Sequence, residues 1–317
     1  LPPLLFVAAV IGHAGILVLL GQPSPGGPRA DANVYLELAM NLWREGTYGT
    51  KVSITYPPLY PMLLAPTFAL ASNAGRFAAI YCLHAALLAA GSLALLPMAR
   101  AHLGRDRAWL TLALVQGAGG VALHSYNAQS EPLFTALVAA CVGVAWSAFS
   151  SRHPLWFLLL GVLAGLGMCT REMGVVVPIA LALLLVHEAR AAARGQGPRP
   201  VIPGLLLLCG VALGLAPKGL AELLHGESIA PYGKNAALAH LSAGGRALLS
   251  LKTALLMLRI AWRHVSYVTV ATFGAPIVLG ALLLRRDGLA PLPLRRAGQA
   301  LAYIAAGLIA LTTLHMI

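Results

Sequence analysis

Long apolar runs separated by short polar connections make up most of this chain. A membrane-spanning helix needs about 20 consecutive apolar residues, so runs of this order predict spans. The runs lie at 4–20, 76–99, 108–123, 132–149, 155–169, 173–187, 201–217, 265–284 and 297–317. The short pair 155–169 and 173–187 has an alternative interpretation as one re-entrant hairpin around Thr170-Arg171-Glu172. We therefore expect an all-α polytopic membrane protein, with about nine transmembrane helices in a single domain over residues 1–317.

Two longer polar-bearing segments, 21–75 and 218–264, interrupt this pattern. In the first, Val34, Leu38 and Leu42 recur at helical spacing, with charged residues on the opposite side. Such amphipathic periodicity is typical of a helix that lies in the membrane interface. The second segment repeats the pattern, with basic residues interspersed among apolar ones over 247–262. We expect interfacial helices in both segments.

Composition agrees with this prediction. The chain is 59% hydrophobic and 10% charged, with a mean hydropathy of +0.79, whereas soluble domains carry about 25% charged residues. The formal charge of +12 is spread between the apolar runs and forms no cluster, so it indicates membrane loops rather than a nucleic-acid surface. Because the chain starts at Leu1 without Met and stops at Ile317 inside an apolar run, we expect a piece of a longer protein.

The charges of the short loops predict the orientation. With the N-terminus inside, the connections 100–107, 151–154, 188–200 and 285–296 carry eleven arginines against three acidic residues. Short loops rich in Lys and Arg remain in the cytoplasm. Both long segments then lie outside, in the periplasm if the protein is in a bacterial inner (plasma) membrane.

Asp31 opens the first outer helix, directly after the first span. A carboxylate placed there is well positioned to take a proton from an acceptor hydroxyl. An aspartate in the same position is also a good helix N-cap. The two roles are compatible, because a capping carboxylate is still a carboxylate, and Asp31 is the candidate catalytic base.

Glu131 and Arg171 are candidates with alternative explanations. Glu131 precedes a span, where Ser130 as cap and Pro132 in the first turn would make an ordinary helix start; alternatively, Glu131 reaches the site as a second polar group. Arg171 interrupts an apolar stretch, and ionisable residues at membrane depth usually face the protein interior or a wet cavity. Its guanidinium suits a phosphate, or it forms, with Glu172, the outer turn of a hairpin.

Further candidates would contact a lipid-linked ligand. Tyr56 and Tyr60 flank a double proline and would either stack on a sugar or belong to an interfacial aromatic belt. Some outward bases would meet a lipid phosphate, although most such residues only sit at the headgroup level. These bases are Lys51, Lys218, Lys234, Arg246, Lys252, Arg259 and Arg263.

Several classes find no support. The sequence contains no GxSxG, Walker loop or HExxH motif, which leaves the hydrolase, ATPase and zincin interpretations without a basis. No His, Asp or Glu group has metal-ligand spacing, and His84 is expected to be an internal polar contact. No metal site is assigned, and a divalent metal requirement stays open.

Four motifs follow the first span in order: Asp31-Ala-Asn-Val-Tyr35, Tyr56-Pro-Pro-Leu-Tyr-Pro61, Ser130-Glu-Pro-Leu-Phe134, and the glycine-rich stretch from Gly161 to Arg171. In this order the chain resembles the GT-C superfamily of membrane glycosyltransferases, such as protein O-mannosyltransferases and lipid A aminoarabinose transferases. The resemblance covers about residues 4–190. The chain departs from the family at Ala32, where relatives often carry a second acidic residue. A second difference is that family members usually continue into further spans or a soluble domain.

The resemblance implies an extracytoplasmic cleft that takes a polyprenyl-phosphate-linked sugar from the lipid. Asp31 would be the catalytic base, and an acceptor hydroxyl or amine would attack the anomeric carbon with inversion. The leaving phosphate needs cationic stabilisation, which gives Arg171 and the bases over 246–263 a role.

We therefore expect a glycosyltransferase for hexosyl or pentosyl transfer. Its candidate partners are membrane lipids and other membrane proteins, and we expect it to bind no nucleic acid. Two alternatives stay open. One is an accessory membrane subunit that kept the fold without the chemistry. The other is a secondary transporter, although the two related halves typical of that class are not visible.

Overall fold

The computed structural model describes residues 2–20, 31–49, 56–117, 128–194 and 201–225. Within these ranges every regular element is a helix, as predicted. The spans expected at 265–284 and 297–317 and the second outer helix lie outside the described residues. The same is true of the bases Lys51, Lys234, Arg246, Lys252, Arg259 and Arg263.

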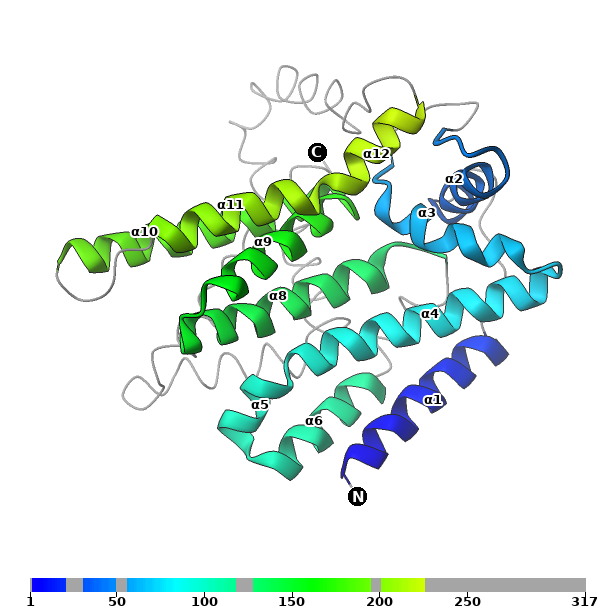
Figure 1. The fold of residues 1–317 in the computed structure, drawn as a ribbon. Helices are drawn as coiled ribbons and strands as arrows, with labels where there is room; N and C mark the ends of the chain where they lie inside the picture. Colours follow the sequence, from blue (N-terminus) through cyan, green and yellow to red (C-terminus); the bar gives the residue numbers. More distant parts are fainter. Residues whose placement is uncertain (1, 21–30, 50–55, 118–127, 195–200, 226–317) are drawn as a thin grey trace, which may run out of the picture.

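The helices include several long rods that lie side by side, with short helices at their ends (Figure 1). In chain order they are α1 (Pro2–Leu20), α2 (Asp31–Glu45), α3 (Leu59–Leu64), the 3-10 helix η1 (Ala65–Ala69), α4 (Asn73–Ala94), α5 (Leu96–Leu103), α6 (Arg105–Gly117), α8 (Glu131–Ser151), α9 (Pro154–Met168), the 3-10 helix η2 (Glu172–Val175), α10 (Val176–Ala193), α11 (Val201–Gly214) and α12 (Ala216–His225).

Four helical stretches in the described part of the chain are long and apolar enough to cross a membrane. They are Pro2–Leu19, Asn73–Ala94, Glu131–Ser151 and Val201–Leu224, and Pro154–Met168 is a shorter apolar helix. The chain is thus a multi-pass membrane protein, while the expected total of nine spans stays a prediction. The pair 155–169 and 173–187 forms two separate helices, α9 and α10, joined through η2.

One predicted span needs correction. The run 76–99 was expected to be a single helix, but α4 ends at Ala94 and α5 begins at Leu96. Pro97 lies in the first turn of α5, where its missing N–H leaves no helical hydrogen bond unmade. A proline further inside a helix would lose that bond, so the chain starts a new helix at this position.

Glycines allow a close helix contact between α9 and α11. A Cβ added to Gly161 would lie 2.2 Å from the carbonyl oxygen of Leu207, and one added to Gly165 would lie 2.5 Å from that of Val211. Gly161 faces Gly210 and Gly165 faces Gly214, in the same order along both helices. The two helices are therefore parallel, with α10 as the returning segment between them. Small residues spaced by four allow such backbone contact between membrane helices.

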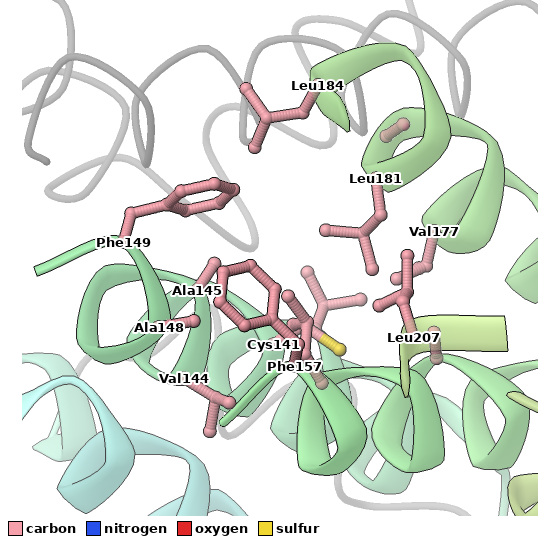
Figure 2. Packing of buried hydrophobic residues seen from close by; sticks show 14 residues of the cluster. Cys141, Val144, Ala145, Ala148, Phe149, Phe157, Val177, Leu181, Leu184 and Leu207 are labelled. Atoms are coloured by element: carbon pink, nitrogen blue, oxygen red, sulfur yellow. The ribbon is translucent and has the colours of Figure 1, made fainter. Parts of the chain in front are cut away.

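The largest apolar core lies where α8, α9, α10 and α11 meet (Figure 2). Phe149 at the end of α8 and Phe157 at the start of α9 pack edge to face, with ring centroids 5.5 Å apart. Leu181 and Leu184 of α10 and Leu207 of α11 close the cluster from the other side. This core fixes the start and the middle of α9.

The outer helix expected after the first span is present as α2 (Asp31–Glu45). Leu38 and Ala39 are buried, whereas Trp43 is half exposed, so the helix is amphipathic as its periodicity predicts. Tyr48, which follows α2, is fully buried and donates a hydrogen bond to the carbonyl oxygen of Tyr56 over 2.7 Å. That bond holds the end of the α2 segment against the start of the α3 segment.

Burial raises the pKa of Tyr48 well above its ordinary value of 10.0. The folded protein favours the neutral phenol of Tyr48. The contribution of this group to the free energy of unfolding is therefore fully present below pH 10 and is lost as the pH rises above 10. We expect the melting temperature of the wild type to fall more steeply than that of Tyr48→Phe between roughly pH 9 and pH 11, with up to about 1.4 kcal/mol per pH unit from this group. Parallel melting profiles for the two proteins would contradict this assignment.

Candidate functional site

Four parts of the chain that are distant in sequence meet at one end of the helical rods. They are α2, α3, the start of α8, and the turn that follows α9 (Figure 1). The backbone N–H of Leu59, at the start of α3, donates to the carbonyl oxygen of Cys169 over 2.8 Å. The hydroxyl groups of Tyr35 on α2 and Ser130 before α8 lie 3.0 Å apart. These two hydrogen bonds hold the segment from α2 to α3 against the start of α8 and the end of α9.

The start of α8 differs in one respect from the expected capping pattern. Pro132 lies in the first turn and Glu131 opens the helix, as predicted. The side chain of Ser130, however, makes no capping hydrogen bond. Its hydroxyl is hydrogen-bonded to Tyr35 instead, because α2 brings a second hydroxyl group within reach, which the local sequence of α8 does not indicate.

Three tyrosines form a cluster at this junction. The ring of Tyr35 packs edge to face against Tyr56 and against Tyr60, with both centroid distances at 5.1 Å. Tyr60 is fully buried, and its hydroxyl lies 2.7 Å from Nε2 of His84. His84 is thus an internal polar contact, as expected. In this conformation Tyr60 has no exposed ring face for a sugar, whereas Tyr56 is partly exposed.

Replacing Tyr60 by phenylalanine tests this internal contact. The substitution keeps the ring and removes the hydroxyl, so Nε2 of His84 loses this partner in a buried setting. We expect destabilisation by about 1–3 kcal/mol, measured as a lower melting temperature of the purified protein. In a double-mutant cycle, His84→Phe removes the other partner of this bond. A loss from Tyr60→Phe that is just as large in the His84→Phe background would mean that the bond to His84 contributes nothing particular.

Glu131 and Arg171, predicted separately as candidates, form an ion pair. Nη1 of Arg171 donates to Oε1 of Glu131, and both side chains are about one-third exposed. The backbone of the turn is fixed, since the Thr170 hydroxyl donates to the carbonyl oxygen of Leu166 over 2.8 Å and the Arg171 N–H to that of Gly167 over 3.2 Å. The guanidinium is therefore placed by the end of α9 and held by the start of α8.

The other site candidates are located less completely. Asp31 is the first residue of α2, one helical turn before Tyr35; the structure describes its backbone but not its side chain. Nζ of Lys218, on α12, lies 3.8 Å from Oε1 of Glu222 on the same helix. Ala221 of α12 packs with Leu38 and Tyr48, so this helix lies beside α2.

Metal-binding groups were also sought at this site. Among the described residues, no group of three or more His, Cys, Asp or Glu side chains is placed to hold a metal ion.

The geometry can be compared with known proteins. The model of the dolichyl-phosphate-mannose-protein mannosyltransferase family matches residues 55–216, just over half of the 317 residues. The chain belongs to this family. It is a GT-C membrane glycosyltransferase, as the order of motifs indicated. Neither the curated proteins nor the solved structures gave a match.

The match to the mannosyltransferase family includes most of the junction. It contains Tyr56 and Tyr60, Ser130 and Glu131, and Arg171, but begins after Asp31. Sequence reasoning missed Tyr35 as a member of this site. Its spacing of four from Asp31 would have been a usable signal, since residues four apart lie on one face of a helix.

Proposed function

We propose that this mannosyltransferase-family protein transfers a sugar from a polyprenyl-phosphate donor to an acceptor hydroxyl or amine outside the cytoplasm. The proposed location is a bacterial inner membrane, with the site facing the periplasm. The observation that carries this proposal is the Glu131–Arg171 ion pair, which lies where α8 and α9 meet the segment that begins with Asp31. Membership of the family supports the same reaction class.

The proposed reaction is a single displacement. The acceptor oxygen or nitrogen forms a bond to the anomeric carbon as the bond from that carbon to the phosphate oxygen breaks. The electron pair of the broken bond goes to the phosphate, the acceptor proton goes to the carboxylate of Asp31, and the configuration at the anomeric carbon inverts.

The leaving phosphate gains negative charge in the transition state, and fixed cations stabilise such charge. Arg171, with its planar guanidinium, is the proposed phosphate ligand. Lys218 and the bases Lys51, Arg246, Lys252, Arg259 and Arg263 are proposed to supplement it, and Tyr56 is proposed to pack against the sugar. Tyr60 supports Tyr56 indirectly, through Tyr35.

The experiment uses the purified protein in nanodiscs with polyprenyl phosphates that carry radiolabelled mannose, another hexose or a pentose. Acceptors are supplied as a peptide mixture rich in Ser and Thr and as an extract of membrane glycans and lipids. We expect label to move from one of the donors to a product while free polyprenyl phosphate accumulates. Intact donors throughout, with a folded protein, would favour an accessory subunit; solute uptake into proteoliposomes without donor consumption would favour a transporter.

A further inference from the structure

The carboxylate of Glu131 has one oxygen without a partner. Oε1 accepts the hydrogen bond of Arg171, whereas Oε2 is buried and has no hydrogen-bond partner among the described residues. A carboxylate can accept about four hydrogen bonds, and a buried charged oxygen without one is costly. One oxygen of the Glu131 carboxylate thus has a hydrogen-bond donor, and the other, Oε2, remains available to accept a hydrogen bond.

The neighbouring hydroxyl groups do not fill that position. Those of Tyr35 and Ser130 are bonded to each other, and that of Tyr60 is bonded to His84. The Glu131 side chain nevertheless keeps 28% of its surface exposed, and Arg171 keeps 30%. The pair is therefore at a surface rather than sealed in the core. Because the terminal torsion of a glutamate is soft, a small rotation of the carboxylate would present Oε2 to a ligand.

The chemistry of this position defines the ligand. A carboxylate oxygen accepts hydrogen bonds and repels anions, while the guanidinium beside it donates and attracts them. A ligand that carries a hydroxyl group next to an anionic oxygen matches both side chains: the hydroxyl group can donate to Glu131, and the anionic oxygen can accept from Arg171. A sugar linked through a phosphate diester has this arrangement, whereas a phosphate without its sugar does not.

We propose that Glu131 binds a hydroxyl of the donor sugar, while Arg171 faces the phosphate to which that sugar is attached. This assignment rests on the proposed function. It makes Glu131 the residue that distinguishes a loaded lipid from the spent lipid phosphate, because only the loaded lipid offers a hydroxyl group to Oε2.

The test measures the binding of two lipids to the full chain in nanodiscs: polyprenyl-phosphate-mannose and sugar-free polyprenyl phosphate. For Glu131→Gln we expect the affinity for the mannosyl lipid to fall about tenfold or more, the scale of a hydrogen bond to a charged group. The affinity for the sugar-free lipid should stay the same or rise, since a negative charge near the phosphate is removed. Glu45→Gln, which changes an exposed carboxylate at the end of α2, is the matched control and should change neither affinity.

A second measurement begins with the wild type, so its first part does not depend on the folding of a variant. In a series of monodeoxy-mannose lipids, the wild type should lose about tenfold affinity for the one that lacks the bound hydroxyl group. Glu131→Gln should show no further loss for that lipid, as expected when the two changes remove one interaction.

The outcomes separate this assignment from the proposed function. Equal losses for both lipids, no loss for either, or no sensitive position in the deoxy series would overturn the assignment and leave the transferase reaction standing. A wild type that binds neither lipid would overturn both.

Discussion

Replacing Asp31 by asparagine is expected to lower the turnover of lipid-linked sugar by about 100-fold to 10,000-fold, the range attributed to a general base. Asparagine has nearly the same shape as aspartate and is an equally good N-cap, so α2 should still form. The loss should appear in kcat rather than in KM, because the carboxylate acts on the proton of the acceptor. The measurement is single-turnover release of polyprenyl phosphate by the purified protein.

Glu37→Gln is the matched control for this prediction. Glu37 lies on the same helix and undergoes the same loss of charge, and we expect its turnover to change by less than about threefold. A loss as large as that of Asp31→Asn would mean that only the charge of α2 matters. Asp31→Asn with near wild-type turnover would reduce Asp31 to a helix cap. A protein whose wild type turns over no donor, with no consequence from Asp31→Asn, would fit the accessory-subunit interpretation.

A large effect on folding is expected from Gly161→Ala. The new Cβ would lie 2.2 Å from the carbonyl oxygen of Leu207 and 2.9 Å from Cα of Gly210, and backbone atoms cannot move aside as a side chain can. The parallel helices α9 and α11 must therefore separate, and overpacking of this kind costs about 1–3 kcal/mol or more. We expect a melting temperature lower by roughly 5–10 °C and a smaller yield of monodisperse protein.

Gly12→Ala provides the control. Gly12 is a helical glycine in α1 whose added Cβ would meet nothing within 4 Å. Alanine favours a helix by about 1 kcal/mol over glycine, so this variant should melt at the same temperature as the wild type or slightly higher. If the two substitutions had equal effects, the close approach of α9 and α11 would be falsified.

The apolar runs predicted the helices because run length and composition are local properties. The starts of α8 and α9 fall within one residue of the predicted spans. The break between α4 and α5 was missed because Leu95 and Leu96 continue the apolar run, while Pro97 acts through backbone hydrogen bonding, which hydropathy does not measure. The parallel pairing of α9 with α11 was also missed, although the glycine spacing in both helices is visible in the sequence.

The site could be predicted only in part. Glu131 and Arg171 were each identified from charge in an apolar context, but their pairing depends on topology. Glu131 begins one helix and Arg171 follows the next, so both lie at the same end of the rods. The hydroxyl pair of Tyr35 and Ser130 has no such signal, because the two residues are 95 positions apart in the sequence and only the complete fold brings them together.

The parallel contact of α9 with α11 has a consequence for biogenesis. The ribosome delivers α9 first, then α10, and α11 only afterwards. During that interval the glycine surface of α9 has no partner helix, so lipid acyl chains must cover it until α11 arrives. A nascent chain paused before residue 201 would therefore expose a groove that membrane quality-control proteases and chaperones can recognise.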